Sequence, residues 1–70
     1  MKMRNYHKEN FYVEPRYDRN RHSMVWEIWR YDANAKARYR AALWPFGDYL
    51  IFHSYIQAVK FLKENSDELV

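Results

Sequence analysis

The chain has 70 residues and a formal net charge of +3, and it contains no cysteine, so we expect one small domain without disulfides or thiolate metal sites. Its single glycine excludes the glycine-rich loops that bind nucleotide phosphates. Seven Tyr, four Phe and three Trp indicate a chain that folds around large aromatic side chains rather than a disordered one.

The positive charge lies mainly in the first part of the chain. Residues 1–40 carry ten Lys and Arg against five Asp and Glu, which gives +5, whereas residues 41–70 carry two against four, which gives −2. A one-sided basic surface attracts anionic partners and speeds their encounter. Scattered solvated charge accounts for the same composition equally well.

Residues 1–9 are polar and basic, and they have no hydrophobic period. They predict a flexible basic arm in front of a single globular domain over residues 10–70. No apolar segment of a secretory signal follows the arm, and no stretch reaches the roughly 18 apolar residues of a membrane span. We therefore expect a cytoplasmic protein that does not bind membranes.

Two strands are predicted next, joined by a turn over residues 18–22. The first covers residues 10–17, and Pro15 places it at a sheet edge or ends it early, because proline cannot donate to a ladder. The second, residues 23–31, is the strongest predicted strand because it is rich in Val, Ile and Trp. Its alternation predicts a core face of Met24, Trp26, Ile28 and Arg30, and an outer face of Val25, Glu27, Trp29 and Tyr31.

A hairpin loop over residues 32–36 leads to a third strand over residues 37–46, which Pro45 and Gly47 stop. Asn34 is the loop residue best suited to a positive φ. In the strand, Arg38 and Arg40 point one way, and Tyr39, Ala41 and Leu43 the other. We expect Arg38 or Arg40 to meet Glu27 or to lie over Trp29 or Tyr31 on the outer face.

Residues 49–52 are compatible with a fourth short strand or with an early helix start capped by Asp48, and we favour the strand. Ser54 and Gln57 fit a capping box. The helix that follows has a predicted apolar face of Tyr55, Ile56, Ala58, Val59 and Leu62. It ends near residues 65–66, after which Leu69 folds back on the core.

The elements together predict an α+β fold in which three or four antiparallel strands carry one C-terminal helix packed on one face. Over Phe11 to Glu64, this order of elements resembles the arm-binding domains of phage integrases and certain plant DNA-binding domains. The resemblance implies an exposed sheet face that contacts DNA. It is a likeness of architecture without a shared motif, so it assigns no functional residue.

The residues for catalysis or metal binding do not come together in this sequence. Its three histidines fall in three separate elements, so we predict no metal, no cofactor, no catalytic residue and no enzyme activity. One alternative remains open, a small basic ribonuclease. It would use Arg38, Arg40, Tyr31, Tyr39 and His22 near one hairpin.

Two binding hypotheses remain, and both use the same basic and aromatic side chains. We favour an inhibitor or regulator that docks on a protein partner with an acidic or nucleic-acid-related surface, because interface hot spots favour Trp, Tyr and Arg. Such small domains resemble phage and mobile-element accessory proteins, among them anti-CRISPR and other anti-defence proteins. The candidate partner-binding residues are Arg16, Arg19, Arg21, Trp29, Tyr31, Arg38 and Arg40.

The alternative is a nucleic-acid-binding module in which the cations contact phosphates and the rings stack on the bases of DNA or RNA. High salt separates the two hypotheses, because phosphate contacts weaken steeply with salt while an apolar interface survives. Self-association into a homodimer through an exposed sheet face or edge strand is a further variant.

Overall fold

The computed structural model describes residues 6–45 and 47–70 and has the predicted α+β fold. One antiparallel sheet has the order β1-β2-β3-β4, and a second pairs β5 with β6. The strands are β1 (His7–Lys8), β2 (Phe11–Asp18), β3 (Ser23–Asp32), β4 (Ala37–Arg40), β5 (Ala42–Leu43) and β6 (Asp48–Tyr49). They are followed by helix α1 (Tyr55–Asn65) and the 3-10 turn η1 (Ser66–Glu68).

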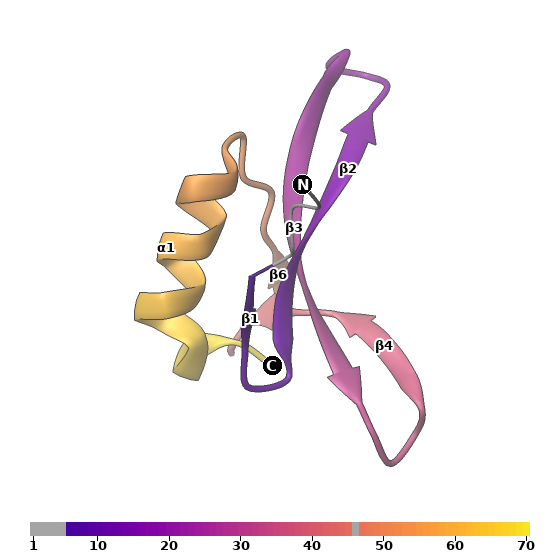
Figure 1. Ribbon diagram of the computed structural model, residues 1–70, viewed down its shortest axis with the longest axis vertical. Helices are drawn as coiled ribbons and strands as arrows, with labels where there is room; N and C mark the ends of the chain where they lie inside the picture. The colour runs from indigo at the N-terminus through magenta and orange to yellow at the C-terminus, as the bar shows by residue number, and fades with distance from the viewer. Residues whose placement is uncertain (1–5, 46) are drawn as a thin grey trace.

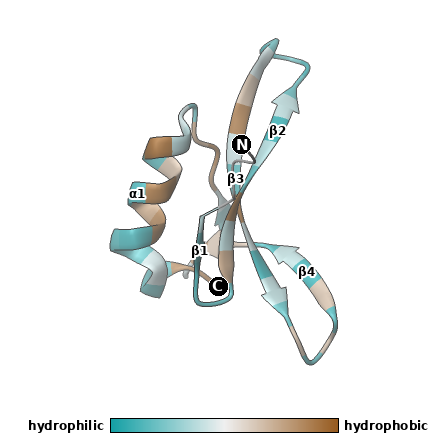
Figure 2. Cartoon of the chain, in the orientation of Figure 1, coloured by the Kyte–Doolittle hydropathy of each residue, from teal (hydrophilic) through white to brown (hydrophobic). Residues whose placement is uncertain are grey.

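Helix α1 packs across one face of the larger sheet and encloses the core between the two layers (Figure 1). Hydrophobic segments of β3 and α1 supply much of this contact (Figure 2). Because each large apolar side chain that leaves water stabilises the fold by about 1.5 to 3 kcal/mol, this layer dominates the stability. The buried cluster consists of Phe11, Val13, Ile28, Ala41, Ala58, Leu62 and Leu69.

Part of the predicted arm belongs to the sheet. Strand β1 pairs with β2, and the Val13 N–H donates to the Tyr6 carbonyl at 3.0 Å. The Lys63 ammonium lies 5.3 Å from the Tyr6 ring centroid, which ties this segment to α1. Residues 6–8 of the expected arm thus take part in backbone pairing and ring contacts despite their polar composition, while residues 1–5 lie outside the described residues.

The β2–β3 and β3–β4 loops share one sequence pattern, in which Asp-x-Asn-x comes before the last loop residue. In each, the aspartate Oδ1 accepts the N–H of the asparagine two residues later, at 3.0 Å in the first loop and 2.9 Å in the second. Such side-chain bonds to the backbone stabilise tight turns. Asn34 does not take the positive φ that we expected; Lys36 has φ 51° and His22 has φ 52°, because the reversal occurs at the final loop position.

Pro15 lies in the middle of β2 without interrupting it. Its partner on β3 is Trp26, whose N–H and carbonyl instead bond Phe52 at 2.8 and 2.9 Å on the other side of β3. In an antiparallel ladder this alternation turns the nitrogen of Pro15 away from β3, toward the outer edge. The edge position predicted for this strand is therefore correct beyond Val13, whose N–H still bonds the Tyr6 carbonyl.

The predicted core face of β3 is correct in its centre and wrong at its start. Trp26 and Ile28 pack in the core, but Met24 is 42% exposed because the tip of the β2–β3 hairpin extends past the end of α1 (Figure 1). The opposite face is not open throughout either. Val25 and Glu27 are buried there, at 0% and 4% exposure.

The third predicted strand keeps its alternation but divides into two sheets. Ala41 and Leu43 face the core as expected, and β4 pairs with β3 while β5 pairs with β6. On the outer side, Ala42 exchanges two backbone hydrogen bonds of 2.9 Å with Val70. Leu69 is thereby brought into the core, as predicted.

The segment before the helix is extended, so the predicted strand, rather than an early helix start, is correct in β6 and at the Phe52 bridge. The Ser54 hydroxyl caps α1 by accepting the Gln57 N–H at 3.4 Å. Ile56 was expected in the core, but it is 76% exposed. With only one layer to pack against, α1 buries the row of Ala58 and Leu62, and Ile56 lies around the helix from that row.

Candidate binding surface

The face of the sheet opposite α1, called the reverse face below, gathers five of the seven predicted binding residues. Directly paired residues of antiparallel strands share a face. Trp29 pairs with Arg40, Tyr31 pairs with Arg38, and Arg16 pairs with Val25 beside them. The reverse face comprises Tyr12, Glu14, Arg16, Val25, Glu27, Trp29, Tyr31, Arg38 and Arg40.

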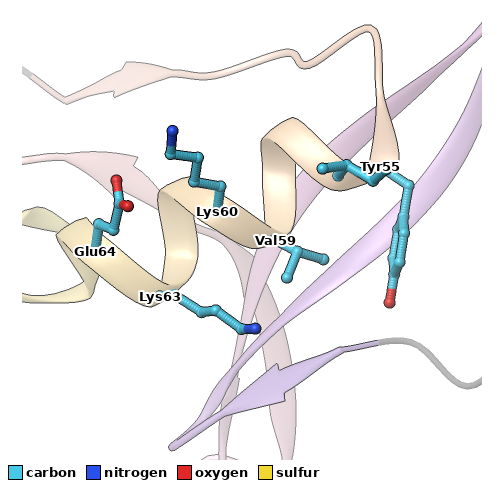
Figure 3. A pocket seen from close by; sticks show the side chains of 6 residues that line it. Tyr55, Val59, Lys60, Lys63 and Glu64 are labelled. Atoms are coloured by element: carbon cyan, nitrogen blue, oxygen red, sulfur yellow. The ribbon is translucent and has the colours of Figure 1, made fainter.

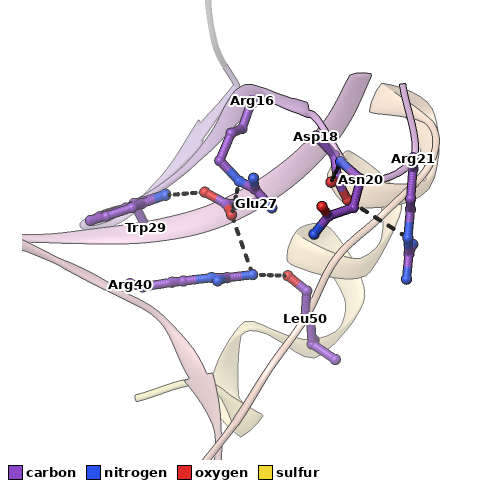
Figure 4. A network of polar contacts seen from close by, with 8 residues as sticks. All are labelled: Arg16, Asp18, Asn20, Arg21, Glu27, Trp29, Arg40 and Leu50. Carbon is purple, nitrogen blue, oxygen red and sulfur yellow. Dashed lines mark hydrogen bonds and ion pairs between the residues drawn. The ribbon is translucent and has the colours of Figure 1, made fainter. Parts of the chain in front are cut away.

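Glu27 is the buried centre of a polar network on this face (Figure 4). Its Oε2 accepts from the Nε of Arg16 at 2.7 Å and lies 3.4 Å from the Nη2 of Arg40. Its Oε1 accepts the indole N–H of Trp29 at 3.1 Å. Burial alone would raise the pKa of Glu27, but these hydrogen bonds and the two guanidinium charges outweigh it and hold the pKa below its ordinary value.

Arg38, on β4, reaches across β3 to the Glu14 carboxylate on β2. Its Nη1 donates to Tyr12 Oη at 3.2 Å and to Glu14 Oε2 at 2.8 Å, and its guanidinium lies 4.8 Å from the Trp29 ring centroid. The hydrogen bond with Tyr12 and then the pairing with Glu14 raise the pKa of Arg38. The side chain remains 53% exposed, so these contacts orient a charged group that solvent and partners can still reach.

Glu14 and Glu27 stand directly opposite each other on neighbouring strands. Like charges in such a pair repel and destabilise a sheet. Arg38 pairs with the first carboxylate, and Arg16 and Arg40 pair with the second, which removes the repulsion. The arginines therefore stabilise the sheet itself, and the three guanidiniums and two carboxylates leave a local charge of +1.

The remaining predicted residues lie elsewhere. Arg21, in the β2–β3 loop, pairs with Asp18 at 3.7 Å and contacts the Nε2 of His53 at 3.1 Å, and Arg19 is exposed in the same loop. Tyr31, by contrast, is one of the five residues on the reverse face, where it is 47% exposed. The loop arginines thus do not join the Arg38 cluster.

The expected contacts of the strand arginines are confirmed, because Arg40 meets Glu27 and Arg38 lies over Trp29. Sequence reasoning did not single out Glu14 as the partner of Arg38, although the strand register pairs Glu14 with Glu27. It also missed an aromatic extension of the reverse face. Tyr49 pairs with Ala42, is 62% exposed and has the Arg40 guanidinium 4.9 Å from its ring centroid. Trp44, in the turn that follows β5, is 67% exposed.

A shallow groove lies along α1 and is lined by side chains of that helix (Figure 3). It has a volume of about 390 Å³, and exposed Ile56 contributes to it. Two lysines and one glutamate border the apolar floor, so it carries little net charge. The lining residues are Tyr55, Ile56, Val59, Lys60, Lys63 and Glu64.

Within residues 6–45 and 47–70, no three His, Asp or Glu side chains gather in a way that could hold a metal ion. None of the helices in this part of the chain has the length and apolar character needed to cross a membrane. Comparisons with protein-family models, with curated proteins and with solved structures find no match for this chain.

Proposed function

We propose that this protein is a small inhibitor or regulator that docks its reverse face on an acidic surface of a partner protein. The observation that carries the proposal is the fixed position of Arg38, between the Trp29 ring and the Glu14 carboxylate. An arginine that is already oriented loses less side-chain entropy on binding than a freely rotating one. Arginine beside Trp and Tyr is also the composition of interface hot spots.

The same geometry favours a protein partner over nucleic acid. Strong phosphate binding needs several cations that are not neutralised, and Glu14 and Glu27 compensate two of the three guanidiniums on this face. Base stacking needs an accessible ring face, and the Arg38 guanidinium covers one face of Trp29. Carboxylates of a protein surface, in contrast, can bind the guanidinium N–H groups of these arginines that point to solvent.

Capture from host-cell lysate, with and without nuclease, tests the proposal. Wild type and Arg19→Ala should retain the same partner protein after nuclease treatment, whereas Arg38→Ala should lose most of it. Arg19 is the matched control because it is an exposed arginine outside the reverse face. Captured material that disappears with nuclease would identify a nucleic-acid-binding module instead, and equal capture by Arg38→Ala would refute the proposed surface.

A further inference from the structure

Strand β4 has an open backbone edge directly beside the arginines. The Ala41 N–H donates to the Ile28 carbonyl at 2.9 Å, so the odd-numbered residues of this strand direct their backbone groups at β3. Tyr31 supports the same alternation, because its N–H bonds Asn10 on the other side of β3 rather than Arg38 opposite it. The backbone N–H and carbonyl groups of Arg38 and Arg40 therefore point outward.

In the part of the chain that the structure describes, one end of this outer edge is covered. The Trp44 N–H donates to the Glu68 carbonyl at 2.8 Å, and Ala42 exchanges two backbone hydrogen bonds of 2.9 Å with Val70. A strand-like segment therefore already pairs there. Farther along the same line, β4 is the last strand of its sheet, and Figure 1 shows it at the periphery, away from α1. Within residues 6–45 and 47–70, no backbone hydrogen bond reaches the outer side of Arg38 or Arg40.

On the opposite side of the sheet, β2 carries a proline where β1 no longer covers it. On β2, Val13 uses its outward N–H to bond Tyr6, and Pro15, the next outward residue, has no N–H. Proline on an edge strand is a common protection against pairing with other chains. Strand β4 has no proline, so β4 and this part of β2 differ in whether they can accept another strand.

Charge selects which strand can be added to β4. The β3–β4 hairpin over residues 30–40 carries four cations, Arg30, Lys36, Arg38 and Arg40, against Asp32 alone. A second copy paired edge to edge around a two-fold axis would place the Arg38 and Arg40 side chains against each other on one face, which is unfavourable. A strand with carboxylates at alternate positions would instead place them beside both guanidiniums.

We propose that β4 takes an extended acidic segment of a partner protein as an added strand, held by the backbone of Arg38 and Arg40 and by carboxylates that bind their side chains. The proposal rests on the proposed function and specifies how the partner binds. Arg38 suits this role because only its Nη1 donates hydrogen bonds to Glu14 and Tyr12. Its Nε and Nη2 have no hydrogen-bond partner within residues 6–45 and 47–70. A carboxylate can bind both of these nitrogens at once.

Amide exchange measured by NMR tests strand addition directly. The probe is a synthetic peptide of alternating Val and Glu with blocked ends, and the control is the same peptide with Lys in place of Glu. With the Glu peptide, exchange at the Arg38 and Arg40 amides should slow, whereas Tyr39 and Ala41, already bonded to β3, should change little. The Lys peptide should leave all four amides unchanged.

Two variants at one position separate the backbone from the side chain. Arg38→Ala removes the guanidinium and keeps the outward N–H, so binding of the Glu peptide should weaken. Arg38→Pro removes both, so binding should be lost, while protection of Tyr39 and Ala41 confirms that the sheet is intact. Equal affinity of these two variants would overturn strand addition, and if Arg38→Pro fails to fold, the exchange data on wild type decide.

The outcomes also separate this inference from the proposed function. If the Glu peptide shifts the Trp29 indole signal without slowing exchange at Arg38 and Arg40, strand addition is refuted and docking on the reverse face stands. If the Glu peptide does not bind at all while lysate capture still depends on Arg38, the acidic strand is again refuted and the proposed function stands. Unchanged lysate capture by Arg38→Ala refutes the proposed function itself.

Discussion

The two faces of the sheet are held together by different forces. The face under α1 is a layer of apolar side chains in which Val13, Ala58 and Leu62 have no exposed surface. The reverse face is held by guanidinium pairs around two carboxylates, with Arg38 and Arg16 still 53% and 44% exposed. Apolar burial is independent of pH, whereas charged pairs respond to protonation and salt.

This difference divides the molecule between stability and recognition. The covered face supplies most of the folding free energy, because the hydrophobic effect grows with the area removed from water. Exposed ion pairs contribute little each, commonly less than about 1 kcal/mol. The arginines can therefore serve a partner without the fold depending on each of them, except where Glu27 is buried among them.

The largest effect should follow from truncation in the covered layer. Leu62→Ala should destabilise the protein by about 2 to 5 kcal/mol, because it leaves a cavity between α1 and the sheet. Denaturant unfolding measures it, and the loss should be the same at 0.05 and 0.5 M NaCl. A strong salt dependence of this loss would show that the covered face is not purely apolar.

A smaller loss is expected at the buried carboxylate. Glu27→Gln should cost about 1 to 3 kcal/mol, because it removes the charge that Arg16 and Arg40 share and weakens their hydrogen bonds. Glu14→Gln is the matched control, since its carboxylate is more exposed. If both variants lose the same stability, burial does not distinguish the two carboxylates.

The pH dependence of the wild type should follow from the same group. The pKa of Glu27 is lower in the folded than in the unfolded state, so its stabilising contribution is fully present above the unfolded pKa of about 4.3. It is lost as the pH falls through the lower folded value. Unfolding midpoints measured from pH 6 downward should therefore fall less steeply in Glu27→Gln than in the wild type, and parallel curves would contradict this assignment.

The smallest effect is expected on the outer side of α1. Ile56→Ala should change the free energy of unfolding by no more than about 0.5 kcal/mol, because the side chain is 76% exposed. The neighbouring Val59→Ala, in a partly buried position against the core, is the comparison and should cost more. A large loss of unfolding free energy in Ile56→Ala would show that Ile56 belongs to the buried face of α1, as the sequence predicted.

The pattern of apolar residues was sufficient to predict the hairpins, the helix and the return of Leu69 to the core. Ile56 was misplaced because helical periodicity specifies an apolar side but not how much of it a single sheet can cover. The paired segment at Tyr6 was missed because its partners are distant in sequence and its own composition is polar. The local sequence pattern thus identified the helix and the strands. Which of their residues are buried could be seen only from how the layers pack in the tertiary structure.

The candidate surface shows the same division. The sequence by itself determined that Arg38 and Arg40 share a face with Glu27, Trp29 and Tyr31, because side chains alternate along a strand and register pairs them. Only the tertiary structure decided that Glu27 is buried, that Arg38 spans β3 to reach Glu14, and that β4 has a free outer edge. These properties depend on strand order and on which groups exclude water from one another, and both are long-range consequences of folding.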